Sequence, residues 1–205
     1  MAQIIVLGAG IVGVSTSIWL QRAGYHVTLV DKAGPASGTS FGNAGVLAAG
    51  GVIPVTTPGL WKKAPFMLLD KNSPLFLRWR YLPKLLPFLF NYLKKCTEED
   101  VNTYAKGMLP LIYDAVEQHK TLANGTPAET FIKDADYCFG YDTETRYLGD
   151  QSSWTLRKQL GFEFKVESGE DYAKTDPLYA EKFHTVVRCK QHGMVTDPGA
   201  YVKAL

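Results

Sequence analysis

The sequence predicts an α/β protein, in which a parallel βαβ unit is followed by the first part of a mixed α+β domain. Two observations predict the unit: residues 3–31 read as strand, glycine-rich turn, helix and strand, and the second strand ends in an acidic residue, Asp31. A third observation predicts the mixed domain, because short aromatic and β-branched runs alternate with helical patterns beyond residue 98.

We expect the βαβ unit to begin at residue 3. Residues 3–8 (QIIVLG) form a short apolar run, typical of a strand buried on both faces of a parallel sheet. Residues 11–23 carry apolar side chains at helical spacing, and Gly24 follows where a helix end favours a left-handed residue. Residues 25–31 (YHVTLVD) then predict a second, parallel strand, reached by a right-handed crossover.

The turn between strand and helix has the spacing GxGxxG of a dinucleotide-binding loop. Gly8 makes the tight turn, Gly10 leaves room for a pyrophosphate at the positive helix end, and Gly13, like Ser17, lets the helix lie close to the strands. Asp31 is placed to accept hydrogen bonds from ribose hydroxyls, and its charge argues against the 2′-phosphate of NADP. A purely structural glycine turn is the alternative. We predict an adenine-dinucleotide site that comprises Gly8, Ala9, Gly10, Ile11, Val12, Gly13, Asp31 and Lys32.

A second loop, residues 32–45, is rich in Gly, Ser, Thr and Ala and has no helical or strand period. An NAD-dependent dehydrogenase would usually continue here into another helix and a third parallel strand. Thr39 and Ser40 offer hydroxyl groups to a phosphate, and Asn43 offers an amide to a polar ring edge. A flexible linker is the alternative, but Phe41 and the apolar run after the loop favour burial.

Residues 6–50 closely resemble the amino-terminal segment of the bacterial D-amino acid dehydrogenases, which are FAD enzymes of the D-amino acid oxidase and glycine oxidase superfamily. The resemblance depends on the glycine turn paired with the signature S-F-x-N-A-G, which residues 40–45 carry as SFGNAG. Ser17 departs from the family's more frequent alanine without steric cost. Three later segments also look like family segments, at residues 58–59, 74–93 and 192–205.

The resemblance implies FAD as the cofactor, with Asp31 on the adenosine ribose and the turn at residues 8–13 on the pyrophosphate. It implies contact with the inner phosphate and the isoalloxazine side for Ser40, Asn43, Ala44 and Gly45. The implied reaction is oxidation of a D-amino acid by hydride transfer to flavin N5, and the imino acid then hydrolyses to a 2-oxo acid and ammonia. A respiratory electron acceptor such as a quinone is the implied partner.

No catalytic residue can be named from this reaction, because the flavin supplies the chemistry and no histidine or aspartate is required for every step. The substrate carboxylate needs a cation, and each of the candidate arginines is expected to be a surface or structural residue instead. These candidates are Arg78, Arg80, Arg146 and Arg188.

Residues 60–95 contain eight basic residues and one acid among many aromatic residues and leucines. One interpretation is a surface that contacts anionic lipid at the inner face of the plasma membrane. We favour the other, short helices packed between the cofactor and substrate domains, because a run broken by proline lacks a sustained amphipathic face. The prolines concerned are Pro65, Pro74, Pro83 and Pro87.

Beyond this stretch, residues 98–122 predict a helix or a helix pair with an acidic start. Strands are expected at residues 137–141, 162–167 and 184–190. We assign residues 1–46 to the first part of a discontinuous FAD-binding domain, and residues 47–205 to a helical connection and the first part of a substrate domain. One βαβ unit supplies two parallel strands, fewer than a Rossmann-like domain needs, so we expect the amino-terminal portion of a longer enzyme.

Composition excludes several other classes. Apolar residues make up 46% and charged residues 20% of the 205 residues, which indicates a folded chain, and a net charge of +2 gives no reason to expect nucleic acid as a partner. The cysteines and histidines lack metal-ligand or disulfide spacing, so we expect no metal site and a reducing compartment. No export signal precedes the first strand and no apolar run could span a bilayer, which predicts a cytoplasmic location.

Two alternatives to a D-amino acid dehydrogenase stay open. One is an oxygen-using amine or amino acid oxidase of the same superfamily, because oxygen reactivity cannot be read from the loop. The other is an inactive, truncated flavoprotein fragment that binds flavin weakly or not at all, because its sheet is incomplete.

Overall fold

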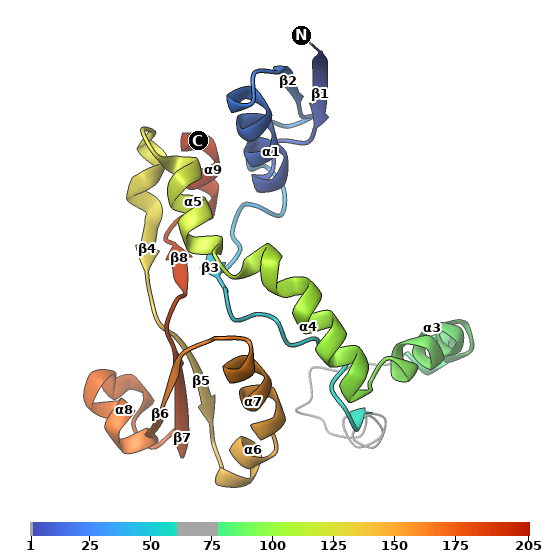
Figure 1. Ribbon diagram of the computed structural model, residues 1–205, viewed down its shortest axis with the longest axis vertical. Coiled ribbons are helices and arrows are strands. Elements are labelled where there is room, and N and C mark those ends of the chain that lie inside the picture. The colour runs from blue at the N-terminus through green and yellow to red at the C-terminus, as the bar shows by residue number, and fades with distance from the viewer. Residues whose placement is uncertain (1, 61–77) are drawn as a thin grey trace.

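The computed structural model describes residues 2–60 and 78–205, and the described part contains three small sheets with helices beside them (Figure 1). At the amino terminus, β1 (Gln3–Leu7) and β2 (His26–Val30) pair in parallel, and α1 (Ile11–Arg22) connects them along the chain. This arrangement confirms the predicted βαβ unit. Gly24 follows the helix with φ of +89°, the left-handed conformation expected after a helix end.

The burial predicted for the first strand is wrong. Ile5 and Leu7 of β1 are 64% and 80% exposed, and Val30 of β2 is 46% exposed. A parallel strand is buried on both faces only when neighbouring strands and helices cover it. In the described chain the sheet has two strands, so its outer edge and much of its face remain in contact with solvent.

The remaining strands form two antiparallel sheets that share a long, bent ribbon. One sheet has the order β3-β8-β4 (Val46–Leu47, Gly193–Val195, Ile132–Asp134), and the other has the order β5-β7-β6 (Tyr137–Tyr141, Thr185–Cys189, Phe164–Ser168). Figure 1 shows β4 leading into β5 and β7 leading into β8. At the bend, the Ala135 N–H donates to the His192 carbonyl at 3.2 Å. The strands predicted near 137–141, 162–167 and 184–190 are confirmed.

Helices connect and cover these sheets. The predicted helix pair at 98–122 is confirmed as α4 (Glu98–Ile112) and α5 (Ala115–Ala123), and the Thr97 side chain caps α4 by accepting from the Asp100 N–H. The other helical elements are η2 (Pro127–Phe131), α6 (Glu144–Leu148), α7 (Gln151–Gln159), α8 (Gly169–Thr175), η3 (Pro177–Tyr179) and α9 (Pro198–Ala204).

The stretch predicted as helical pieces at 60–95 is described only from residue 78, so the expectations for Pro65 and Pro74 lie outside the described residues. After η1 (Trp79–Tyr81), α3 runs from Leu82 to Lys94 through Pro87 without a break, so the predicted interruption there is wrong. Proline removes one hydrogen bond and strains the preceding turn, which a helix can absorb. No residue of α3 is fully buried in the described chain, and the packing of this stretch between two domains stays a prediction.

The largest buried apolar cluster joins the beginning of the chain to its end. Val14 of α1, Val116 of α5 and Tyr201 of α9 belong to it, together with Leu47 and Val195. A second cluster holds Ala49 and Val52 of the loop after β3 against α4 and α7. The glycine turn and the second loop are therefore supported by segments that follow them in sequence by more than a hundred residues.

Candidate functional site

The glycine turn has the geometry that its sequence predicts. Gly8 has φ of +102°, a conformation that favours glycine, and its N–H donates to the Val30 carbonyl at 2.7 Å. A Cβ atom at Gly13 would collide with the Gly8 carbonyl, so this glycine lets α1 begin directly beside β1. A Cβ atom at Gly10 would lie 3.1 Å from the Ser40 hydroxyl oxygen, so any side chain here would push against the second loop.

Asp31 organises the start of the second loop while its carboxylate remains exposed. Its Oδ2 accepts from the Ala9 N–H at 2.9 Å, and its Oδ1 accepts from the N–H groups of Ala33 and Gly34 at 2.8 and 3.0 Å. These backbone hydrogen bonds, that from Ala9 first, lower the pKa of the carboxyl below its usual value. Asp31 is therefore an ionised acceptor at neutral pH, held beside the glycine turn and open to a ligand.

Ser40 joins the second loop to the first. Its side chain is buried, and its Oγ accepts from the Ile11 N–H at the start of α1 at 2.8 Å. The Ala36 N–H also donates to the Ala9 carbonyl at 2.9 Å. The two loops thus lie side by side. Between them and α9 is a cavity of about 170 Å³, whose lining includes Ile11, Ser40, Asn43, Gly45, Pro198 and Tyr201.

Asn43 shapes the second loop from within. Its Oδ1 accepts from the Gly45 N–H at 2.8 Å, and its Nδ2 donates to the Ser40 carbonyl at 3.2 Å. Gly45 has φ of +65°, and a Cβ atom there would collide with the Val195 carbonyl of β8. The loop therefore needs both an asparagine turn and a glycine to reach the β3–β8 pair.

Some predicted residues remain at the surface of the described chain. Val12, Lys32 and Ala44 are exposed, and no hydrogen bond from the Lys32 side chain is seen among the described residues. Phe41 is 66% exposed, so the expectation that it would be buried is wrong. Its ring contacts the backbone at Gly199, where a Cβ atom would come within 2.7 Å of it.

Two buried side chains that sequence reasoning missed hold the peptide of Gly50, just beyond the second loop. His192 accepts from the Gly50 N–H through Nε2 at 3.2 Å, and Arg157 donates from Nε to the Gly50 carbonyl at 3.3 Å. The Nδ1 of His192 lies 2.7 Å from the Lys190 carbonyl, which can only accept, so Nδ1 carries the proton. No spacing in the sequence signals this contact, because the partners are 142 and 107 residues away.

Arg157 is the most unusual of the described cations. It is 7% exposed, its guanidinium lies 4.5 Å from the Trp154 ring centre and 5.1 Å from that of Phe139, and burial lowers its pKa. Its Nη1 has no hydrogen-bond partner among the described residues. The aromatic rings and the Gly50 carbonyl therefore offset only part of the cost of burying this charge.

The arginines proposed for a substrate carboxylate do not converge on the two loops. Arg188 pairs with Glu167 at 2.9 Å and reaches Asp136 at 3.5 Å, and Arg146 pairs with Asp142 at 2.9 Å. Arg78 and Arg80 are exposed at the start of η1. Within the described chain, none of the four is a residue of the cofactor site, which agrees with the structural roles we expected for them.

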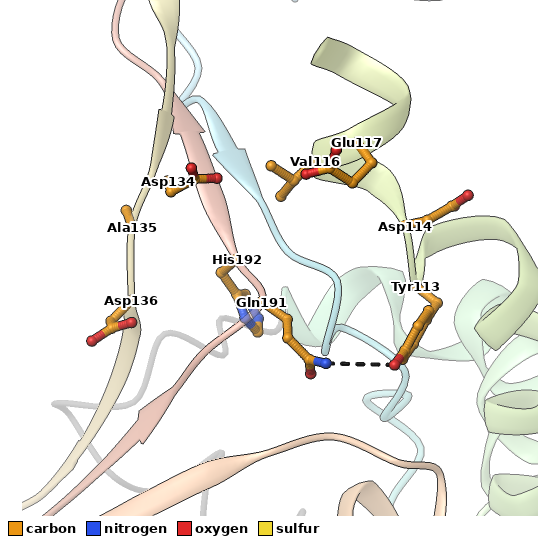
Figure 2. A pocket seen from close by; sticks show the side chains of 9 residues that line it. All are labelled: Tyr113, Asp114, Val116, Glu117, Asp134, Ala135, Asp136, Gln191 and His192. Atoms are coloured by element: carbon orange, nitrogen blue, oxygen red, sulfur yellow. Dashed lines mark hydrogen bonds between the residues drawn. The ribbon is translucent and has the colours of Figure 1, made fainter. Parts of the chain in front are cut away.

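A separate hollow of about 620 Å³ lies at the bend of the ribbon. Figure 2 shows Asp134 and Asp136 on one wall, Asp114 and Glu117 on the other, and His192 between them. Lys120 bridges the walls, with Nζ 3.0 Å from Glu117 and 2.8 Å from Asp134. Because carboxylates predominate, this hollow disfavours an anionic group such as the carboxylate of an amino acid.

A metal centre finds no support in the part of the chain that the structure describes. No three His, Cys, Asp or Glu side chains gather there in a way that could hold an ion. His184 and His192, eight residues apart, bond instead to Thr185 and to backbone groups.

The residues present fit an adenine dinucleotide that the protein binds along both halves, the adenosine half at the glycine turn and the other half at the second loop. A glycine turn opens onto the start of α1, the ionised Asp31 lies beside it, and the second loop is bonded to that turn through Ser40. An NAD site needs only the first two of these features. Among the described residues, no helix is long and apolar enough to cross a membrane.

Comparisons with known proteins agree with this geometry. Residues 3–205 match the family described as FAD dependent oxidoreductase (DAO). A D-amino-acid oxidase of Bradyrhizobium diazoefficiens is 35% identical over 206 residues, which cover 99% of this chain and 49% of the relative. D-amino acid dehydrogenase 1 of Mesorhizobium japonicum is 38% identical over 125 residues, which cover 60% of this chain and 30% of the relative.

Among solved structures, the fold resembles that of glycine oxidase from Geobacillus kaustophilus, with a TM-score of 0.58 at 16% identity, over 100% of this chain and 43% of that one. At this identity the likeness concerns the fold alone. The chain spans about half the length, or less, of the curated relatives that it matches.

Proposed function

The chain belongs to the family of FAD-dependent oxidoreductases, as its resemblance predicted, and we propose that it provides the cofactor-binding part of an enzyme that oxidises D-amino acids to 2-oxo acids and ammonia. The observation that carries the proposal is the bond between Ser40 and the Ile11 N–H, which holds the second loop against the dinucleotide turn. The D-amino acid as substrate class is supported by the names of the two curated relatives.

Each predicted residue has a role in holding the cofactor. The turn at residues 8–13 receives the pyrophosphate, because it has no side chain in the way at Gly8 or Gly10 and faces the positive end of α1. Asp31 and the neighbouring Lys32 lie at the adenosine end, where the carboxylate accepts from ribose hydroxyls. Ser40, Asn43, Ala44 and Gly45 hold the inner phosphate and the flavin side.

FAD, when bound, accepts the hydride that leaves the α-carbon of the amino acid. The residues of this chain orient the cofactor and exclude water from its inner half. Asn43 holds the turn at Gly45, and the Gly45 carbonyl accepts from the Val195 N–H of β8, so β8 anchors the second loop. We propose no catalytic residue among the described ones.

The division of the chain at residue 46 is part of the same proposal. Residues 1–46 contribute the first part of the FAD-binding domain, and residues 47–205 contribute the connection and the first part of the substrate domain. Residues that grip the substrate carboxylate are proposed to lie in the portion of the relatives that this chain does not cover, 51% of the length of the oxidase (100 − 49).

The electron acceptor separates two candidate activities. A dehydrogenase passes electrons to a respiratory acceptor such as a quinone, at the cytoplasmic side of the plasma membrane, whereas an oxidase uses oxygen. We favour the dehydrogenase because the second loop reads SFGNAG, the form that resembles the dehydrogenases. The oxidase stays the second candidate, since an oxidase aligns over 99% of the chain.

The test begins with purified chain and added FAD, followed by absorbance and by quenching of flavin fluorescence. Saturable binding that Asp31→Asn weakens is the expected result, and the matched control Asp142→Asn, an exposed carboxylate of the substrate part, should bind as the parent does. In the longer enzyme of which this chain is the proposed part, D-amino acids added anaerobically should bleach the flavin absorbance, and L-amino acids should not. Turnover with a quinone analogue or with oxygen identifies the acceptor.

Three results would contradict different parts of the proposal. A preparation that stays colourless with excess FAD would show that the chain alone is an inactive, truncated fragment. Binding of FAD that is insensitive to Asp31→Asn would refute the assigned site, even in an active protein. Bleaching by L-amino acids alone would refute the substrate class.

A further inference from the structure

The segment of η1 and α3, residues 78–95, presents an apolar surface that the rest of the described chain does not cover. Trp79, Tyr81, Leu86, Phe88 and Phe90 are between 53% and 63% exposed. Figure 1 shows α3 beyond the end of α4, away from the three sheets. A cluster of exposed large apolar side chains of this kind marks an interaction site.

The helix is amphipathic, and its exposed apolar face is wider than its half-buried stripe. Leu82, Leu85 and Leu89 lie at helical spacing and are half-buried, so they form the inner stripe. The exposed Leu86 and Phe90 extend the apolar face on one side of that stripe. Phe88 extends the face on the other side. Lys84, Asn91, Lys94 and Lys95 share the opposite, polar face.

The charge of the segment has one sign. Between Arg78 and Lys95 the sequence has five basic residues and no acid. Among the described residues, this segment makes one ion pair, from Lys95 to Asp100 at 2.9 Å. The Lys94 ammonium group lies over the Phe90 ring, with Nζ 4.3 Å from the ring centre, so a cation and an aromatic ring lie together at the edge of the apolar face.

We infer that residues 78–95 dock the protein on an anionic lipid surface, with the aromatic side chains at the boundary of headgroups and acyl chains and the basic residues on lipid phosphates. A helix of 13 residues is about 20 Å long, too short to cross a bilayer and long enough to lie in its plane. Aromatic rings at the apolar edge and cations on the polar face are the features of such interfacial helices.

A protein partner would need an acidic, apolar face shaped to fit this helix, whereas a bilayer satisfies both requirements without shape complementarity. The unbroken course of α3 through Pro87 removes our objection that the segment lacks a sustained amphipathic face. The inference does not depend on which substrate the enzyme oxidises.

Flotation of the purified chain with vesicles tests the inference. We expect binding to vesicles that contain phosphatidylglycerol, little binding to phosphatidylcholine alone, and release by salt. Replacing Arg78 and Arg80 by glutamine should lower partitioning about fivefold for each cation removed. Phe88→Ser with Phe90→Ser should lower it at least as much, and both pairs are exposed, so folding should persist.

The matched controls are Leu178→Ser, an apolar side chain that is 71% exposed beside α8, and Lys182→Gln. Both should float as the parent protein does. Equal binding to neutral and anionic vesicles, or equal loss in the controls, would overturn the inference. So would self-association that Phe90→Ser abolishes in a protein that does not float, because the occupant of the surface would then be a second copy.

Discussion

Replacing His192 by phenylalanine removes the hydrogen bonds of one buried side chain beyond the second loop, and His192→Gln then tests the bond to Gly50. Phenylalanine keeps a ring of similar size, which can still stack on Tyr137 as the imidazole does, with ring centres 5.6 Å apart and planes 17° apart. It removes Nε2, the acceptor for the Gly50 N–H, and also the Nδ1–H that donates to the Lys190 carbonyl. Gly50 is buried, and so is His192, at 5% exposure, so water has little access to the stranded donor.

The expected cost follows from that burial. A buried donor left without a partner costs about 1–3 kcal/mol, which corresponds to about a 5- to 150-fold change in the unfolding equilibrium. With a urea slope near 2 kcal/mol per M, the unfolding midpoint should fall by about 0.5–1.5 M. His192→Gln places an amide oxygen near the position of Nε2 and should recover part of the loss.

Urea unfolding, followed by circular dichroism, measures the effect on the free energy of unfolding. The matched control is His184→Phe, the same replacement at an exposed histidine, which should change the midpoint little. If His192→Phe unfolds at the parent midpoint, or if His192→Gln and His192→Phe are equally destabilised, the assigned role of the Gly50 bond is wrong.

Three further results are expected. Gly13→Ala should destabilise the chain by about 1–3 kcal/mol in thermal unfolding because its Cβ collides with the Gly8 carbonyl, whereas Gly107→Ala, with open space around it in α4, should not. The pKa of Asp31 in the folded chain lies below its usual 3.8, so the carboxylate stabilises the fold above pH 3.8, and this stabilisation is lost as pH falls through the folded pKa. The Tm of the parent should therefore exceed that of Asp31→Asn at neutral pH, and the two Tm values should meet in strong acid. Thermal unfolding measured across this pH range tests the expectation. Cys189 is buried, which raises the pKa of its thiol to about 11, so iodoacetamide at neutral pH should modify it only after unfolding, and rapid modification of the native chain would contradict this placement.

The local sequence pattern was sufficient to predict the helices and strands and the dinucleotide-binding turn. The order of residues 3–31 predicts the parallel pair and its helix because strand period, helix period and glycine conformation are properties of neighbouring residues. Asp31 was also placed correctly beside the turn, since the length of the crossover fixes where the second strand ends. The family, too, could be identified from residues 6–50, through the paired glycine turn and SFGNAG loop.

Burial could not be predicted in the same way. Leu7 and Phe41 are apolar and exposed, whereas Arg157 is charged and buried, because burial depends on which distant segments cover a residue. The course of α3 through Pro87 likewise depends on the whole helix, which keeps enough other hydrogen bonds to tolerate one proline.

The sequence by itself determined the family, the cofactor class and the residues of both glycine loops, because these are carried by short motifs. Only the tertiary structure decided how the loops are held. Ser40 reaches the Ile11 N–H across 29 residues, and His192 reaches the Gly50 N–H across 142. Hydrogen bonds of this kind depend on distances between segments that the fold brings together, and no spacing along the chain records those distances.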